Sequence, residues 1–386
     1  MRAFSARPID PMEGVTEPMT QPIRPQRGLN SIHPYVPGKP IDEVKREFGL
    51  DDVIKMASNE NPIGVSPKAL DAMRDALSRL NHYPDGASYE FRSALAAHFD
   101  VDRAQVAVGN GADDLILELS MAFLDEGDEV VVSRSSFPMY DIYAAAMRAQ
   151  MIKTPLTPQL GIDLDAMADA VTDRTRLIYV CNPNNPTGTI VGASDVDRFV
   201  NRIPERVIVV MDEAYVEMVD SDDFPDSLAY VRDGRPNVVV LRTFSKVYGL
   251  AGIRIGYGFA HADLVTTLFK IKPPFNVNVL AQVAGIAALD DGDFVARSVA
   301  ENRRGREALY AGFTRLGLEV APSHTNFILV RFGLQAAAVQ QALLERGVIV
   351  RPCGGYDLPE HLRISIGTAA ENARLLQELE AVLADG

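Results

Sequence analysis

The sequence predicts an α/β protein in which a large domain is built on a mostly parallel sheet and a smaller α+β domain follows it. The chain has 386 residues, more than one hydrophobic core usually holds. From residue 105 onward, short β-rich runs alternate with helix-like stretches such as residues 114–124. Apolar runs separated by helices are typical of a parallel sheet buried on both faces. The runs are QVAVG, DEVVVS, RLIYVCN, RVIVVMDEAY, NVVVLRTFSK and RIGYGFA.

A break in this pattern marks the expected start of the second domain. The segment IKPPFNVN, residues 271–278, carries two prolines and two asparagines, and a helical region then precedes NFILVRF, GVIVRP and HLRISIG. We therefore expect a large domain over residues 56–275 and a small C-terminal domain over residues 276–386. Residues 31–55 are expected to pack near the small domain. Residues 1–30 lack the apolar centre of a secretory signal and are expected to form a loose arm.

The composition excludes several classes of partner. A formal net charge of −14 opposes binding to nucleic acid or an anionic membrane, so any anionic ligand must be held by a few local basic groups. No run approaches the roughly 18 apolar residues of a membrane span. The two cysteines, Cys181 and Cys353, lie far apart in the chain. This spacing indicates neither a metal cluster nor a disulfide framework, and it fits a reducing cytoplasm.

Polar residues follow the apolar runs at Asn110, Asn185, Asp212 and Lys246. In open α/β sheets, ligands bind beyond the carboxyl ends of the strands. We therefore expect these side chains to converge in one crevice.

Lys246 lies in the stretch TFSKVYGLAGIRIGY, directly after Ser245 and eight residues before Arg254. Lysine forms imines with aldehydes when its amine is desolvated or lies near positive charge. Gly249 and Gly252 leave room for a ligand to approach the backbone, and Ser245 and Arg254 could together bind a phosphate. An imine-forming lysine beside a phosphate site suggests pyridoxal 5′-phosphate. If the Ser-Lys pair is considered alone, the alternative is that Lys246 is an ordinary lysine on the protein surface.

A pyridoxal phosphate site also needs groups at the far end of the ring. Asp212, in VIVVMDEAY, supplies a carboxylate at a strand end that could keep the pyridine nitrogen protonated, and Tyr215 could donate to the phenolic oxygen. Asn185, in the tight bend CNPNNPTG, presents an amide for the same oxygen. Alternatively, Asp212 could be an ordinary acidic residue in the turn after a strand, and Asn185 could belong to a loop without a role in binding.

Two further segments offer cofactor contacts. VGNGADDLI places two glycines before a helix that would begin near Ala112 and Asp113, where free N–H groups favour a phosphate. SSFPMY offers Phe137 and Tyr140, either of which could stack on a pyridine ring, with core packing as the alternative.

Two arginines lie among β-branched residues, Arg351 in GVIVRP and Arg363 in HLRISIG. An arginine in such surroundings needs an anionic partner, which could be a substrate carboxylate or phosphate. A structural ion pair with one of the many acids is the alternative.

Taken in order, GNGADD, NPNNPTG, DEAY, TFSK and LRISIG resemble the fold-type I pyridoxal-phosphate aminotransferases. HPYVPGKPIDEV, SNENPIGVSPKA and NHYPDGASYEFRSALAAHF resemble the histidinol-phosphate aminotransferase branch of that family. The resemblance runs from about residue 30 to the end. It implies a seven-stranded, mostly parallel sheet in the large domain, and it implies no metal.

The resemblance assigns roles position by position. It makes Lys246 the lysine that binds the cofactor covalently, Asp212 the partner of the pyridine nitrogen, and Asn185 with Tyr215 the contacts of the phenolic oxygen. Phe137 matches the ring-stacking aromatic. Tyr83 matches a tyrosine that reaches the cofactor phosphate of the neighbouring subunit, which implies a homodimer with shared active sites. The implied phosphate contacts are Ala112, Asp113, Ser245 and Arg254. The implied substrate contacts are Tyr35, Asn61, Arg351 and Arg363.

The implied reaction is a two-stage transamination, from histidinol phosphate to an oxo acid, most simply 2-oxoglutarate, in histidine biosynthesis. An aromatic amino-acid aminotransferase on the same scaffold is the nearest alternative, since a pocket for imidazole can admit a phenyl ring. A decarboxylase or lyase with the same cofactor is another, because the fold does not decide the reaction. A non-catalytic cofactor-binding regulator would need a DNA-binding module, for which residues before 30 supply neither the length nor the basic charge.

Overall fold

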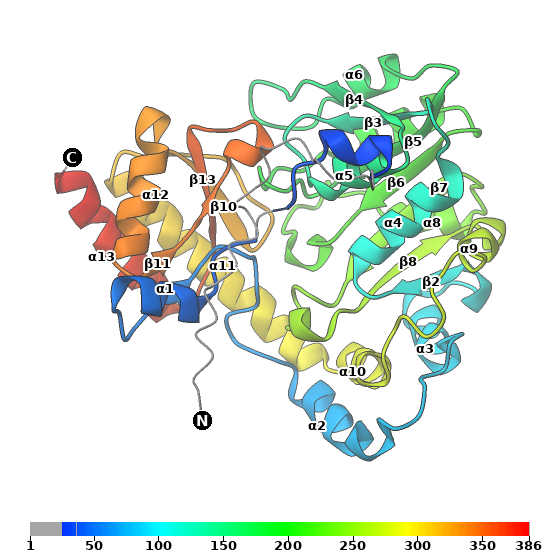
Figure 1. Ribbon diagram of the computed structural model, residues 1–386, viewed down its shortest axis with the longest axis horizontal. Coiled ribbons are helices and arrows are strands. Elements are labelled where there is room, and N and C mark those ends of the chain that lie inside the picture. Colours follow the sequence, from blue (N-terminus) through cyan, green and yellow to red (C-terminus); the bar gives the residue numbers. More distant parts are fainter. Residues whose placement is uncertain (1–24, 36, 386) are drawn as a thin grey trace.

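A seven-stranded sheet forms the centre of the larger part of the molecule (Figure 1). All its neighbouring strands pair in parallel except β8, which runs antiparallel to both neighbours. The computed structural model describes residues 25–35 and 37–385, so the expected N-terminal arm lies outside it up to residue 24. In spatial order the strands are β2 (Val106–Gly109), β8 (Gly256–Ala260), β7 (Val238–Thr243), β6 (Ile208–Asp212), β5 (Thr175–Cys181), β3 (Glu129–Ser133) and β4 (Gln150–Thr154).

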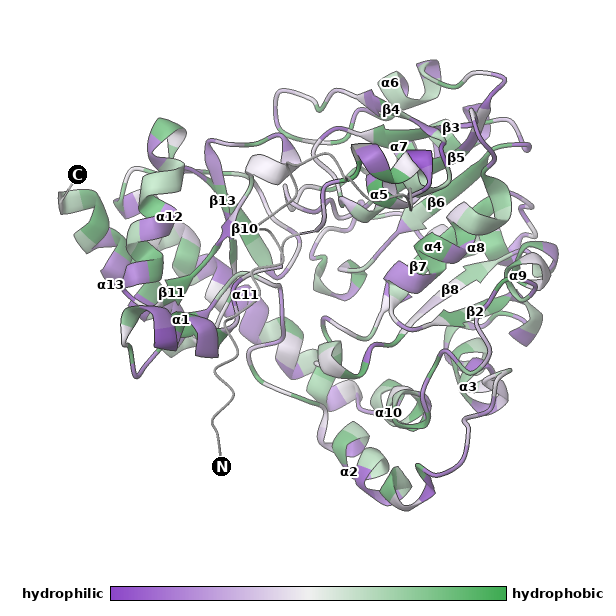
Figure 2. Ribbon diagram, viewed as in Figure 1, coloured by the Kyte–Doolittle hydropathy of each residue, from purple (hydrophilic) through white to green (hydrophobic). Residues whose placement is uncertain are grey.

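Helices cover both faces of this sheet. Alternate strand residues point to opposite faces, so Val209 belongs to one hydrophobic core and Val210 to the other. The predicted α/β class is confirmed, and Figure 2 shows the apolar strands enclosed between the layers. One face packs against α2 (Pro67–Ala76), α3 (Tyr89–Phe99), α6 (Leu164–Asp169), α7 (Ala193–Arg202), α8 (Ser227–Arg232) and α10 (Val279–Leu289). The other packs against α4 (Ala112–Phe123), α5 (Met139–Ala146) and α9 (Ala262–Leu268).

The smaller part of the molecule is built on a four-stranded antiparallel sheet beside a short parallel strand pair. In β1, Ile54 and Lys55 pair with Val348 and Ile349, which joins the segment before residue 56 to this part. The strands are β12 (Arg351–Pro352), β13 (His361–Ser365), β10 (Phe327–Arg331), β9 (Glu319–Val320), β1 (Ile54–Lys55) and β11 (Val348–Ile349). The helices are α1 (Ile41–Phe48), α11 (Gly292–Arg315), α12 (Ala336–Glu345) and α13 (Ala369–Asp385).

Short 3-10 turns connect these elements. They are η1 (Arg27–Ser31), η2 (Leu77–Arg79), η3 (Arg103–Gln105), η4 (Val216–Met218), η5 (Ala251–Ile253), η6 (Gly333–Gln335) and η7 (Gly354–Tyr356). The described end of the N-terminal arm is in contact with the larger part, because η1 lies against α5 (Figure 1) and Gln26 Nε2 donates to Ala146 O at 2.6 Å. No helix among the described residues has the length and apolar character needed to cross a membrane.

Helix α10 follows the expected domain boundary at residue 276 but packs with the larger part. Its Ala281, Ala284 and Ala288 lie in the same core as Phe91 of α3. A Cβ on Gly285 would lie 2.6 Å from the Phe91 ring, so the small side chains of α10 allow a close approach of the two helices. The long helix α11 then leads into the smaller part (Figure 1).

Candidate active site

A cavity of about 290 Å³ opens at the carboxyl ends of β5, β6 and β7, where the two parts of the molecule meet. Parallel strands bring these ends to one edge of the sheet, which is why residues distant in sequence converge there. Most of the predicted site residues line it. These are Tyr35, Ala112, Asp113, Phe137, Asn185, Asp212, Tyr215, Ser245, Lys246, Arg254 and Arg363.

Lys246 projects into the cavity just after β7. Its Nζ donates to Ser58 O at 3.4 Å and lies 5.5 Å from the centre of the Tyr215 ring. Burial, together with the positive charges of Arg363 and Arg254, lowers the pKa of Lys246 to about 8. About a tenth of the amine is therefore unprotonated at pH 7, far more than for an ordinary lysine. This is the condition under which a lysine acts as a nucleophile or a base.

Asp212 ends β6 and is only 4% exposed. Burial raises its pKa to about 6, and hydrogen bonds to the ionised form oppose that rise. Tyr140 OH donates to Oδ2 at 2.6 Å, and Ala214 N donates to Oδ1 at 3.2 Å. The carboxylate is thus held at the cavity wall as a hydrogen-bonded anion.

Arg363 of β13 is 3% exposed and reaches the cavity from the smaller part. Its Nη1 donates to Asn185 Oδ1 at 2.5 Å and to Tyr356 OH at 3.3 Å, and Nη2 donates to Ala57 O at 2.8 Å. Within the described part of the chain it forms no ion pair with a carboxylate, and its Nε has no hydrogen-bond partner. A buried guanidinium held only by neutral groups calls for an anion. The structural ion pair considered from the sequence is therefore not what holds Arg363.

Glycines shape a second basic corner of the cavity around Arg254. A Cβ on Gly111, whose φ is +98°, would lie 2.6 Å from Arg254 Nη2. A Cβ on Gly256 would lie 2.1 Å from the backbone nitrogen of Ala112. Arg254 Nη1 also donates to Ser245 Oγ at 3.5 Å. The first N–H groups of α4 have no partners inside their helix, so this corner combines a guanidinium, a hydroxyl and a helix start, as a phosphate site requires.

Asp113 lies in the first turn of α4 with its carboxyl held away from solvent. Tyr143 OH donates to Oδ2 at 2.8 Å, while Oδ1 has no partner in the described chain. Burial raises the pKa of this carboxyl. Because a carboxylate repels a phosphate, the backbone N–H of Asp113 is the group suited to an anion there.

Asn59 shares the wall with Tyr215 and was missed in the sequence. Its Nδ2 donates to Tyr215 OH at 3.0 Å, and Ser365 Oγ donates to its Oδ1 at 2.9 Å. Asn61, predicted to bind substrate, does not line the cavity, because its Nδ2 donates to Val247 O and Ser298 Oγ at 2.8 and 2.9 Å. The string SNENP thus contains an asparagine that lines the cavity, but it is Asn59 and not the predicted Asn61. Ser58, Glu60 and Tyr356 also line the cavity without having been predicted.

Three other predicted residues lie elsewhere. Asn110, expected in the crevice, is exposed and outside the cavity lining. Arg351 lines an adjoining cavity of about 670 Å³ beyond Tyr35 and Tyr356, with its guanidinium 5.1 Å from the centre of the Tyr35 ring. Tyr83 is 81% exposed and stacks on Phe275 with ring centres 4.7 Å apart, outside the cavity of its own chain.

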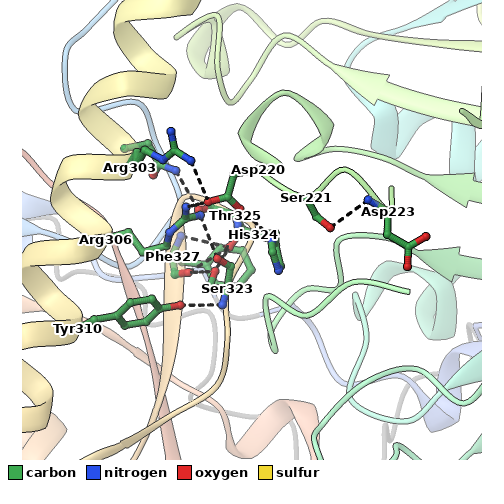
Figure 3. A network of polar contacts seen from close by, with 11 residues as sticks. Asp220, Ser221, Asp223, Arg303, Arg306, Tyr310, Ser323, His324, Thr325 and Phe327 are labelled. Carbon is green, nitrogen blue, oxygen red and sulfur yellow. Dashed lines mark hydrogen bonds and ion pairs between the residues drawn. The ribbon is translucent and has the colours of Figure 1, made fainter. Parts of the chain in front are cut away.

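A polar network of residues that do not line the cavity joins the two parts of the molecule (Figure 3). Asp220, which follows η4, accepts from His324 Nδ1 at 2.8 Å and from Arg306 of α11. The backbone nitrogen of His324 donates to Gly188 O at 2.9 Å, in the bend that carries Asn185. The Asn185 bend is therefore fixed against the segment that leads into β10.

Comparisons with known proteins agree with this geometry. Residues 51–379 match the family described as aminotransferase class I and II. The chain is 46% identical over 372 residues to a histidinol-phosphate aminotransferase of Moorella thermoacetica, covering 96% of each chain. It is 48% identical to one of Akkermansia muciniphila, covering 90% of this chain and 96% of that one.

A solved structure shows the same arrangement. The crystal structure of histidinol-phosphate aminotransferase from Sinorhizobium meliloti in complex with pyridoxal-5′-phosphate superposes with a TM-score of 0.88 at 29% identity, covering 95% of this chain and 100% of that one. The chain belongs to the class I and II aminotransferases, in the histidinol-phosphate aminotransferase branch of these pyridoxal-phosphate enzymes.

Proposed function

We propose that the enzyme transfers the amino group of L-histidinol phosphate to 2-oxoglutarate. The observation that carries this proposal is Arg363, a buried guanidinium without a carboxylate partner in the described chain, in the same cavity as Lys246. The substrates named for the relatives at 46% and 48% identity support the same reaction. We place the enzyme in the cytoplasm, where its two buried cysteines would stay reduced as they are in the structure.

The residues present fit pyridoxal phosphate. The corner formed by Gly111, Gly256 and Arg254 suits its phosphate, Lys246 suits its aldehyde, and the Asp212 carboxylate suits a protonated pyridine nitrogen. In this proposal Ser245 Oγ, Arg254 and the N–H groups of Ala112 and Asp113 hold the phosphate. Asn185 and Tyr215 contact the phenolic oxygen, and Phe137 covers the ring.

Three side chains of the protein have separate roles in this proposed reaction. Bound pyridoxal phosphate supplies an electron sink for the bond broken at the substrate carbon. Lys246 Nζ, with its lowered pKa, would take the proton from the substrate Cα and, as a general acid, deliver it to the cofactor carbon that retains the amino group. Asp212 holds the proton on the pyridine nitrogen. Asn59 fixes the Tyr215 hydroxyl through a 3.0 Å hydrogen bond, so that hydroxyl needs no reorientation during the reaction.

The two substrates present different anions to the same guanidinium. Histidinol phosphate has a phosphate and no carboxylate, whereas glutamate has carboxylates and no phosphate. A planar guanidinium can donate two parallel hydrogen bonds to either group. We assign this recognition to Arg363 inside the cavity, with Arg351 and Tyr35 toward the adjoining cavity, where the rest of the substrate would extend.

Spectral titration of the purified enzyme tests the substrate. The enzyme with bound cofactor is mixed with L-histidinol phosphate or L-phenylalanine in single-turnover experiments, and loss of the cofactor's visible band is followed. We expect half-conversion at a histidinol phosphate concentration at least about ten-fold lower, because a phosphate carries more negative charge than the carboxylate of phenylalanine and offers more oxygens to the Arg363 guanidinium. A preference for phenylalanine would instead identify an aromatic amino-acid aminotransferase.

We further propose a homodimer in which Tyr83 of one chain reaches the cofactor phosphate of the other. Its 81% exposure and its ring stacking on Phe275 fit a side chain presented to a partner. Tyr83→Phe keeps the ring and removes the hydroxyl. We expect the Kd for pyridoxal phosphate to rise about ten-fold, because a hydrogen bond to a charged group is lost.

Equilibrium dialysis measures that Kd, and light scattering measures the mass in solution. Tyr89→Phe is the matched control, since Tyr89 is another exposed tyrosine, at 50%, and its ring would still stack under Arg103. A monomer in solution, or equal affinities for both variants, would rule out the shared site.

We propose that the larger domain ends near residue 291 rather than 275, because α10 packs in its core. The site then lies between this domain and the smaller one, which contributes Arg363 and Tyr356.

A further inference from the structure

Tyr140 contacts the cavity residue Asp212 from the protein interior, behind the cavity wall. The tyrosine is fully buried, belongs to α5 and is absent from the cavity lining, whereas Phe137, three residues earlier, does line it. Its hydroxyl donates to Asp212 Oδ2 at 2.6 Å. Of the two aromatics considered as ring-stacking candidates, only Phe137 therefore faces the cavity.

The Tyr140 hydrogen bond is the short one of the two that Asp212 accepts in the described chain. An O–H···O⁻ distance near 2.6 Å is typical of a charge-assisted bond, about twice as strong as a neutral one. The other donor, Ala214 N, is 3.2 Å from Oδ1. The nearby acids Glu213 and Asp113 act in the opposite direction and favour protonation of Asp212. Tyr140 is thus the side-chain donor that stabilises the charged form.

The ring of Tyr140 is itself held firmly. It stacks on Tyr179 of β5 with ring centres 4.3 Å apart and an interplanar angle of 9°. Phe137 meets it edge to face, with centres 5.7 Å apart at 82°. The Tyr140 side chain therefore supports both a cavity aromatic and a cavity carboxylate, the two groups that would contact a pyridine ring from its face and at its nitrogen.

We propose that Tyr140 is a positioning residue whose hydroxyl fixes the Asp212 carboxylate and keeps it charged, so that the proton of a bound pyridoxal ring stays on the nitrogen. This inference rests on the proposed roles of Asp212 and the cofactor. It goes beyond them by assigning the protonation of the ring to a residue that touches neither the substrate nor the cofactor.

The physical consequence of removing the hydroxyl follows from proton sharing. Asp212 and the ring nitrogen compete for one proton. A hydrogen bond donated to the carboxylate stabilises its charged form, so the proton spends less time on Asp212 and more on the nitrogen. Tyr140→Phe keeps the stacked ring and removes only the donor. Asp212 then becomes more basic than it is in the wild type, and the shared proton shifts from the nitrogen toward the carboxylate.

The test uses the full-length enzyme loaded with ¹⁵N-labelled pyridoxal phosphate. In Tyr140→Phe we expect the ¹⁵N resonance of the ring to move from the protonated toward the unprotonated position, and the cofactor Kd to rise about ten-fold. Tyr179→Phe is the matched control: it removes a hydroxyl from the other ring of the stacked pair, one with no hydrogen bond to Asp212. An unchanged resonance in Tyr140→Phe, or an equal shift in Tyr179→Phe, would overturn the proposal.

A double-mutant cycle separates this role from a merely structural one. If Tyr140 acts through Asp212, Tyr140→Phe changes the Kd about ten-fold in the wild type but less than two-fold in Asp212→Asn. Equal effects in both backgrounds would contradict the inference. Failure of the wild-type protein to bind pyridoxal phosphate would instead contradict the proposed function, so the two outcomes are distinguishable.

Discussion

Lys246→Ala is expected to lower the rate of amino-group transfer at least about 10⁴-fold, because it removes both the covalent anchor and the acid–base group. The geometry supports so large an effect. Lys246 lies in the cavity with Asp212, and burial with two nearby arginines holds its pKa near 8. The phosphate corner around Arg254 is untouched by the substitution, so the cofactor should still bind, but without a covalent bond.

Borohydride reduction followed by peptide mass mapping measures the covalent bond directly. The peptide containing Lys246 should gain the mass of the cofactor in the wild type, and no peptide should gain it in Lys246→Ala. Lys270→Ala, an exposed lysine outside the cavity lining, is the control and should behave as the wild type. Turnover of Lys246→Ala within about ten-fold of the wild type would refute the general acid–base role.

Side chains that lie at strand ends were predictable from the sequence. Asp212 and Lys246 follow long apolar runs, and in a parallel sheet such positions meet at one edge. The Gly-rich turn before α4 was predictable for a similar reason, since only glycine tolerates a φ of +98° with an arginine 2.6 Å from the Cβ position.

Other features depend on packing between distant segments and leave little local signal. Asn59 and Asn61 sit in one string, and only the fold shows that Tyr215 OH faces the first of them. The edge strand β4 was missed, because its residues QMIKT are partly exposed and polar. The Tyr140 contact joins residues 72 positions apart and cannot be read from spacing alone.

The cavity wall also shows why the two parts of the molecule must act together. Asn185 comes from the bend after β5, and Arg363 comes from β13 of the smaller sheet, yet the two side chains share a 2.5 Å hydrogen bond. Farther out, Asp220 of the larger part binds His324 and Arg306 (Figure 3). Movement of the smaller part would therefore displace a proposed substrate contact and a proposed cofactor contact at once.

Arg363→Ala is expected to lower kcat/KM about 10²–10³-fold for both histidinol phosphate and glutamate, mainly through KM. The Arg363 guanidinium is buried in the cavity wall and has no carboxylate partner among the described residues. Its loss therefore leaves the anion of either substrate unpaired. Both half-reactions should suffer, because the same group serves a phosphate in one and a carboxylate in the other. Single-turnover titrations with each substrate measure the two effects separately.

Arg363→Lys separates charge from geometry. A lysine keeps the positive charge but cannot donate two parallel hydrogen bonds. We therefore expect kcat/KM of Arg363→Lys to exceed that of Arg363→Ala by less than about ten-fold. Arg331→Ala is the matched control, because Arg331 lies on the neighbouring strand β10 with exposed ion pairs to Glu319 and Glu360. If Arg363→Ala impaired only one of the two substrates, the other anion would have to bind elsewhere, and Arg351 beside the adjoining cavity would be the next residue to replace.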